Sequence, residues 1–182
     1  NGPGLRNTWG YNAEVQFLAN RGYAVLQVNY RGSTGYGKQF YSLGLKQGNQ
    51  KIQDDLADGI KWLIDSKTVD QKKIAIYGTG FGGYIALNAV IKNPSLYKCA
   101  ASNSGILNLF SYLNSIPPYY KSNLQMYYDI IGNPVTEVDY MSKASPLFNV
   151  DKIKTPVFIA QNIKDTRTDV SDAIRFVKEL KK

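Results

Sequence analysis

The residues from Ile74 to Gly83 place a short apolar run directly before a cluster of glycines. The run Ile74–Tyr77 predicts a short buried strand. Glycines follow at positions 78, 80, 82 and 83, and most residues from 84 to 90 are apolar and form the buried side of a predicted helix. A strand that turns sharply into a helix through glycines is suited to present a chemical group at the turn. We therefore expect the functional site of this chain to include this stretch.

Two known turns have this setting. The nucleophile elbow Gly-x-Ser-x-Gly of α/β-hydrolases presents a serine hydroxyl. The turn Gly-x-Gly-x-x-Gly holds the pyrophosphate of a dinucleotide. Gly78, Gly80 and Gly83 fit the second spacing, whereas the first requires a serine where Gly80 stands. The hydroxyl of Thr79 comes one residue early, so its side chain points elsewhere and is a poor substitute.

The dinucleotide turn makes two further demands on the sequence. It needs an acid about 20 residues on, at the end of the next strand, to hold the ribose. The residues there are Ser102, Asn103 and Ser104, and no Asp or Glu occurs between Gly83 and Asp129. The turn also normally follows the first strand of its domain. These points favour the elbow, and a nucleotide-binding module remains the less favoured alternative.

The composition limits the chemistry that these 182 residues can perform. The chain has no histidine, which removes the commonest general base and the commonest metal ligand. We expect no metal and no cofactor. Cys99 is the only cysteine, so no internal disulfide can form, and its neighbours Ala100 and Ala101 predict a buried thiol.

Charge and hydropathy exclude other classes. The net charge of +8 comes from scattered basic residues, so we interpret it as a solvated surface and expect no nucleic-acid partner. No apolar run approaches the roughly 18 residues of a membrane span, so we expect no membrane partner. No signal peptide opens the sequence, which favours a cytoplasmic location, although Asn1–Gly4 resembles the interior of a longer protein.

Strands and helices alternate along the predicted chain. The pattern predicts strands at Ala24–Val28, Ile74–Tyr77, Cys99–Ser102 and Val157–Gln161, and helices at Asn12–Asn20, from Ile52 to near Ser66, and up to Lys92, with short helices between Gly105 and Ser145. The last helix should bury Val170, Ala173, Ile174, Val177 and Leu180. We assign a structural role to the acids Asp54 and Asp55.

This alternation predicts an α/β fold whose open, mostly parallel sheet has helices on both faces. Sites in such sheets form at the carboxyl ends of the strands. Three loops are expected there: Asn29–Gly37, Gly78–Gly83 and Gln161–Arg167.

Several blocks in a fixed order resemble one known family. They are Gly2-Pro3, Leu18–Val25, Asn29–Gly37, Asp54–Leu56, Trp62–Ile64, Val69-Asp70, Ile74–Gly83, Ser145-Pro146 and Asp165–Arg167. Together they are similar to the catalytic α/β-hydrolase domain of the prolyl oligopeptidase family of serine peptidases (family S9). The resemblance runs nearly end to end, and it implies that residues 1–182 form a single, partial hydrolase domain, incomplete at both ends, and no second domain.

The resemblance also implies roles for individual residues. Gly80 stands at the nucleophile position, the backbone N–H of Phe81 at the first oxyanion donor, and Asp165 at the triad acid. The resemblance places the triad histidine beyond Lys182 and the second oxyanion donor before Gly2. Glycine has no oxygen with which to attack a carbonyl, and no histidine is present to move the proton. We therefore expect no detectable peptidase activity from this chain, whether it is a piece of a larger protein or a decayed gene.

The family's substrates are short peptides, often cut beside proline or after an N-terminal dipeptide. We expect the aromatic segment Phe110–Tyr128 to form the wall of the substrate pocket, with Phe110, Tyr112, Tyr119 and Tyr120 as the substrate-binding candidates. The parent protein should add an N-terminal β-propeller and the remaining hydrolase segments, including a central strand between Ala24–Val28 and Ile74–Tyr77. A non-catalytic binding protein on the hydrolase fold is the alternative function.

Overall fold

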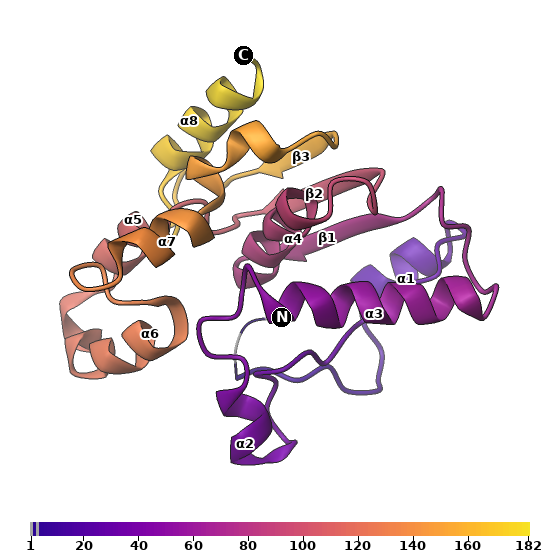
Figure 1. The fold of residues 1–182 in the computed structure, drawn as a ribbon, viewed down its shortest axis with the longest axis horizontal. Coiled ribbons are helices and arrows are strands. Elements are labelled where there is room, and N and C mark those ends of the chain that lie inside the picture. Colours follow the sequence, from indigo (N-terminus) through magenta and orange to yellow (C-terminus); the bar gives the residue numbers. More distant parts are fainter. Residues whose placement is uncertain (1, 3) are drawn as a thin grey trace.

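Figure 1 shows the computed structural model of the chain, which describes Gly2 and residues 4–182. Three parallel strands form one sheet in the order β1 (Ala75–Thr79), β2 (Cys99–Asn103) and β3 (Val157–Ala160). In the register of this sheet, Ile76 pairs with Ala100. Ala100 in turn pairs with Val157. The predicted parallel sheet and these three predicted strands are confirmed.

Helix α4 (Phe81–Lys92) follows β1 directly and packs across β1 and β2. Every residue from Gly83 to Val90 is buried, so the helix is covered on all sides and carries almost no polar face. The helix ends at the predicted position, because Asn93 caps it and Pro94 follows. The strand, turn and helix expected between Ile74 and Lys92 are therefore confirmed.

Helix α8 (Val170–Leu180) covers β3 and buries Ala173 and Phe176. Phe176 has no exposed surface, whereas Ile174 is 66% exposed. The prediction that Ile174 faces the core is wrong. It lies about 100° around the helix from Ala173, which places it on the flank of the buried stripe.

Helix α3 (Lys51–Asp65) confirms the helix predicted before β1, and it packs against α4. Its two adjacent acids form separate ion pairs. Asp55 accepts from the backbone and the guanidinium of Arg31 at 2.5–2.9 Å. Asp54 pairs with Lys92 of α4 at 2.6 Å. Both acids have the structural role that we expected.

The N-terminal third departs from one prediction. Helix α1 (Ala13–Ala19) forms as expected, with Asn12 as its cap, and helix α2 (Gly37–Ser42) was not foreseen. The predicted strand at Ala24–Val28 is wrong, because residues 23–30 have no regular structure. A strand requires hydrogen bonds to a neighbour, and no strand among the described residues pairs with this segment.

The residues between β2 and β3 form short helices, as predicted. They are α5 (Leu109–Asn114), η1 (Pro118–Asn123), α6 (Leu124–Ile131), α7 (Val138–Ala144), η2 (Pro146–Phe148) and η3 (Val150–Lys152). Leu109, Met141 and Tyr84 of α4 belong to one buried apolar cluster. Within Gly2 and residues 4–182, no helix has the length and apolar character to cross a membrane.

The two faces of the sheet differ. Ala100 and Ser102 face α4 and are buried, whereas Tyr77 and Phe158 on the opposite face are 44% and 68% exposed. Side chains alternate along a strand, so Cys99 lies on the exposed face with Tyr77. The prediction of a buried Cys99 thiol is therefore wrong.

Candidate active site

The turn between β1 and α4 has the backbone shape of an elbow. Gly80 adopts φ 57° and ψ −119°, a region that other residues enter only with strain. Its N–H donates to the carbonyl of Asn103 at 2.9 Å, and its own carbonyl accepts from the N–H of Tyr84 at 3.1 Å. A Cβ added at Gly80 would meet no atom within 4 Å. The turn thus has open space for a side chain and presents none.

The neighbouring glycines are required by close packing. A Cβ at Gly78 would lie 2.2 Å from the carbonyl carbon and oxygen of Gly82. A Cβ at Gly83 would lie 2.5 Å from the hydroxyl of Ser102 and 2.8 Å from the Cα of Gly105. The helix therefore crosses both strands so closely that only hydrogen fits at these positions. This crossing explains Gly78 and Gly83, whereas Gly80 is set apart by its backbone angles.

Phe81 is the first residue of α4, beside the elbow. The first turn of a helix leaves its N–H groups without helical acceptors, and the helix dipole makes this end positive. The ring of Phe81 packs against that of Tyr84, with centroids 5.1 Å apart. A Cβ added at Gly2 would lie 3.5 Å from the Cβ of Phe81, so the N-terminal segment reaches this position. Pro3, the other residue of that predicted block, lies outside the described residues.

Asp165 lies on the loop after β3. Its carboxylate accepts from the N–H of Arg167 at 2.8 Å and of Thr168 at 3.1 Å. Burial alone would raise the pKa of Asp165, but hydrogen bonds from Arg167, Thr168 and Ser104 lower it below its usual value. The group is therefore a carboxylate at neutral pH.

The sheet topology brings the elbow and the acid to one edge. Gly80 follows β1, Ser104 follows β2 and Asp165 follows β3. Because these strands are parallel and adjacent, their carboxyl ends lie side by side. The structure thus places the predicted nucleophile position and the predicted acid where an α/β site would form.

Arg167 is a further residue of this edge. Its Nη2 donates to the Tyr112 hydroxyl at 2.9 Å, and its Cζ lies 5.1 Å from the centre of that ring. Its Nε is buried and has no acceptor among the described residues. Burial raises the pKa of Tyr112, and the nearby cation opposes that rise. The Nε–H of Arg167 is therefore an unsatisfied buried donor, and a ligand oxygen that reached it would accept a charge-assisted hydrogen bond.

We assigned no role to Arg167 from the sequence. Its position two residues after Asp165 was the available signal. Tyr127 of α6, whose ring centre lies 6.0 Å from the Cζ of Arg167, gave no signal beyond membership of an aromatic segment.

The substrate-binding candidates separate in the structure. Tyr112 accepts a hydrogen bond from Arg167 and so lies beside the loop that carries Asp165, which we call the acid loop. Phe110 packs at the core, with its ring 6.2 Å from that of Phe148. Tyr119 and Tyr120 lie on η1 with rings 4.9 Å apart, and Tyr119 is 77% exposed. Contact of these four residues with a substrate stays a prediction.

Comparison with known proteins places these features in a wider context. Residues 9–182 match the family model described as "Prolyl oligopeptidase family". The chain is 36% identical over 181 residues to "Dipeptidyl aminopeptidase BIII" of Pseudoxanthomonas mexicana, which covers 98% of this chain and 26% of that protein. It is 31% identical over 184 residues to "Dipeptidyl peptidase family member 6" of Caenorhabditis elegans, which covers 100% of this chain and 25% of that protein.

Solved structures of peptidases are also similar to this chain. A puromycin-hydrolyzing peptidase of Mycobacterium tuberculosis superposes with a TM-score of 0.89 at 29% identity, over 99% of this chain and 27% of that one. The acylaminoacyl peptidase of Pyrococcus horikoshii superposes with a TM-score of 0.87 at 27% identity, over 99% of this chain and 29% of that one. The chain spans about a quarter of the length of the curated relatives it matches.

Proposed function

Because the chain belongs to the prolyl oligopeptidase family and has its α/β-hydrolase fold, we propose that it is part of the catalytic domain of a serine-type peptidase for short peptides. Its relatives include a dipeptidyl aminopeptidase and acylamino-acid-releasing enzymes. The proposed ligands are accordingly peptides with a free N-terminal dipeptide or an acylated first residue.

The open elbow at Gly80 carries the proposal. Its backbone is shaped to present a nucleophile, and the N–H of Phe81 follows at the helix N-terminus, where developing negative charge is stabilised. Asp165 holds a carboxylate after β3, two strands along the sheet from β1, and Arg167 has an unsatisfied donor. The N–H of Phe81 and the guanidinium of Arg167 are donors that a peptide carbonyl oxygen can accept from, whereas the Asp165 carboxylate can only accept from N–H or O–H groups.

Acyl transfer needs two further groups. A nucleophilic oxygen must attack the carbonyl, and a base must take its proton. Gly80 has no side-chain oxygen, and none of the 182 residues is a histidine. We therefore propose that these residues bind a peptide but do not cleave it. This property favours the second candidate function, a peptide-binding domain that keeps the hydrolase fold.

Turnover tests the inactive elbow. The purified chain is incubated with a chromogenic dipeptide substrate and with an N-acetylated amino-acid substrate, and we expect no release of chromophore. Phe81→Pro is the control, because proline at the first helical position removes the oxyanion N–H without removing a helical hydrogen bond. Phe81→Ala, which keeps the N–H and removes the same ring packing against Tyr84, accounts for the loss of the side chain. Turnover by the unchanged chain that Phe81→Pro abolishes would contradict the proposal.

Binding tests the retained site. Fluorescence anisotropy of a labelled dipeptide amide and a labelled N-acetylated peptide should show saturable binding. Arg167→Met should weaken it roughly 10-fold, because one charge-assisted hydrogen bond is lost. Arg175→Met is the matched control, since Arg175 also lies over an aromatic ring, that of Phe148, but on α8. No binding, or an equal loss in both variants, would refute a peptide site at the acid loop.

A further inference from the structure

The lysines of this chain are scattered in the sequence, but the parallel sheet gathers many of them at one edge. Ala75, the first residue of β1, is in register with Cys99, the first residue of β2. Val157, the first residue of β3, is in register with Ala100, the second residue of β2. The three strands therefore start within one residue of the same level. The sheet has an even amino edge, which lies opposite the carboxyl edge that carries the candidate active site.

Lysines occupy the segments that lead into these strands and the ends of two helices. They are Lys67 after α3, Lys72 and Lys73 before β1, Lys98 before β2, Lys152 and Lys154 before β3, and Lys178, Lys181 and Lys182 at the end of α8. All of these side chains are exposed. We call this set of nine lysines the basic edge. In Figure 1, the segments that carry it run from the right-hand end of α3 up to the C-terminus.

Packing holds the segments of the basic edge side by side. The N–H of Lys98 donates to the carbonyl of Ile74 at 2.7 Å, which joins the starts of β1 and β2. Ile74 and Ile153, which lies shortly before β3, pack against one buried apolar cluster. Ile153 and Leu180, near the end of α8, pack against a second. The starts of the strands and the end of α8 are therefore parts of one surface.

The basic edge carries more than half of the net charge of the chain. Its segments contain four acids, which are Asp65, Asp70, Asp151 and Glu179. Nine lysines and four acids give +5, out of +8 for the whole chain. Lys73 lies 4.0 Å from Asp70 and Lys182 2.8 Å from Glu179, and such exposed pairs contribute little to stability. Among the described residues, five of the lysines form no ion pair: Lys67, Lys72, Lys98, Lys178 and Lys181.

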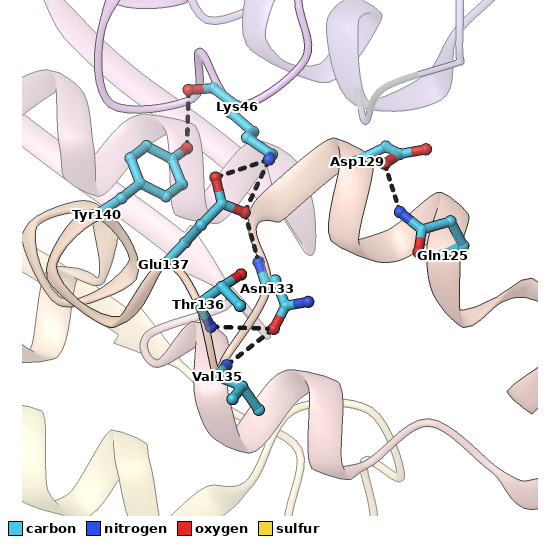
Figure 2. Close-up of polar contacts among 8 residues, drawn as sticks. All are labelled: Lys46, Gln125, Asp129, Asn133, Val135, Thr136, Glu137 and Tyr140. Carbon is cyan, nitrogen blue, oxygen red and sulfur yellow. Dashed lines mark hydrogen bonds and ion pairs between the residues drawn. The ribbon is translucent and has the colours of Figure 1, made fainter.

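Two lysines away from this edge are, in contrast, neutralised by close partners. The ammonium group of Lys46 donates to both oxygens of Glu137 at 2.7 and 2.8 Å, as Figure 2 shows. The N–H of Lys46 donates to the carbonyl of Ile130 near the end of α6 at 2.9 Å, and its carbonyl accepts from the Tyr140 hydroxyl at 2.7 Å. The ammonium group of Lys92 is likewise paired with a carboxylate. These two lysines hold parts of the fold together, which most lysines of the basic edge do not.

The chemistry of the basic edge fits a flat anionic surface. Lysine offers a point charge on a flexible four-carbon stem and demands no fixed geometry from its partner. No arginine is among the nine, although arginine is a usual residue for specific contacts to nucleic-acid bases. Trp62, in the last turn of α3 shortly before Lys67, is 65% exposed. Tryptophan is enriched where a membrane meets water, so a bilayer with anionic headgroups suits both the lysines and this ring.

We propose that the basic edge docks on the surface of a membrane that contains anionic lipids, with Trp62 at the level of the headgroups. In this orientation the carboxyl edge of the sheet, with the candidate active site, faces away from the membrane into water. The sequence-based expectation of no membrane partner considered only a spanning segment, which docking does not require. Docking goes beyond the proposed peptide function and does not rest on it.

Co-sedimentation of the full chain with lipid vesicles tests the docking. One set of vesicles contains phosphatidylcholine alone, and the other contains phosphatidylcholine with phosphatidylserine. We expect binding to the second set only. Raising the salt from about 0.1 M to about 1 M should release the chain, because the Debye length falls from about 10 Å to about 3 Å. Equal binding to both sets, or binding to neither, would overturn the proposal.

A triple variant tests whether the basic edge is the docking surface. Lys72→Gln, Lys98→Gln and Lys181→Gln together remove three charges that lie along the edge and form no ion pair among the described residues. A lysine close to an anionic surface contributes roughly fivefold to the partition coefficient, so the triple variant should bind roughly 100-fold more weakly. All three side chains are exposed, so the fold should be unaffected.

A second triple variant is the matched control. Lys38→Gln, Lys51→Gln and Lys143→Gln remove the same charge from exposed positions on α2, at the start of α3 and on α7. This variant should keep most of the vesicle binding, because its lysines lie away from the basic edge. An equal loss in the two variants would show that net charge alone attracts the membrane, and it would overturn docking through this edge.

Tryptophan fluorescence tests the orientation. The chain has two tryptophans, so Trp9→Phe leaves Trp62 as the only one. Its emission should shift to shorter wavelength when vesicles with phosphatidylserine are added, because the ring enters a less polar layer. In Trp62→Phe, the emission of Trp9 should not shift. A shift from Trp9 alone would overturn the proposed orientation.

Other polyanions are the competing partners. Labelled single-stranded DNA and polyglutamate are titrated into the unchanged chain and into both triple variants. Binding of either one through the basic edge, without binding to vesicles that contain phosphatidylserine, would overturn the membrane proposal. None of these measurements uses a peptide substrate, so a failure of the proposed function would leave their outcome unchanged.

Discussion

Replacing Gly80 with alanine tests whether the elbow is strained by its backbone or by its surroundings. Gly80 has φ 57° and ψ −119°, and an added Cβ meets no atom within 4 Å. The cost should therefore come from the backbone alone. Strain of this kind costs about 1–3 kcal/mol. Alanine also restricts the unfolded chain, which offsets about 0.4–1 kcal/mol of that cost.

The net loss of unfolding free energy should lie between about zero and 2.6 kcal/mol, with a centre near 1.3 kcal/mol. Urea unfolding followed by circular dichroism measures it. Two controls bracket the result. Gly10→Ala has neither a positive φ nor a contact within 4 Å, so only the effect on the unfolded chain applies, and the free energy of unfolding should rise by about 0.4–1 kcal/mol. Gly78→Ala places a Cβ 2.2 Å from the backbone of Gly82, so it should be the most damaging of the three.

The order of the three variants in free energy of unfolding shows whether the elbow is strained and whether it has room for a side chain. If Gly80→Ala and Gly10→Ala change the free energy of unfolding by the same amount, the backbone of the elbow carries no strain. If Gly80→Ala equals Gly78→Ala, the position is not open, and a serine could not have stood there. Either result refutes the reasoning that this turn keeps an elbow shape with room for a nucleophile.

Three further predictions concern the fold. Arg31→Met removes the guanidinium from the half-buried Asp55 carboxylate, which keeps only the backbone N–H of residue 31, and should lower the free energy of unfolding by about 1.5–3 kcal/mol in urea titrations. Hydrogen bonds from the Lys46 side chain and from the backbone N–H of Asn133 lower the pKa of Glu137. The stability that Glu137 contributes is therefore present above its ordinary pKa and is lost as pH falls through the lowered value. Between pH 7 and pH 3, the urea midpoint of unfolding should fall less in Glu137→Gln than in the unchanged chain. Phe176→Ala should cost about 3–5 kcal/mol and Ile174→Ala under about 1 kcal/mol, because only Phe176 is fully buried; equal losses would contradict the packing of α8.

Local sequence patterns were enough to predict most elements. The strand and helix around Gly80 are adjacent in the chain, and their glycines are demanded by a crossing only a few residues long. Helix α3 and the start of α1 follow from apolar spacing and from the Asn12 cap. The order of several blocks also allowed the family to be identified, since its motifs are contiguous in sequence.

Other features depend on neighbours that are remote in sequence. The mostly apolar residues Ala24–Val28 have strand composition, yet a strand forms only where a partner offers hydrogen bonds. Cys99 follows the alternation of its strand, and its exposure is decided by which face of the sheet is covered. In α8, Phe176 is buried and Ile174 is exposed because only Phe176 lies on the side of the helix that packs towards β3.

The sequence by itself determined the family, the alternation of strands and helices that makes the sheet parallel, and the identity of the residue at the elbow. Only the tertiary structure showed that Arg167 has an unsatisfied donor between two tyrosines, and that Lys46 holds the end of α6. The physical reason is separation along the chain. Contacts between residues 46 and 137, or 112 and 167, leave no periodicity in the sequence, because they exist only after the sheet and its helices have packed.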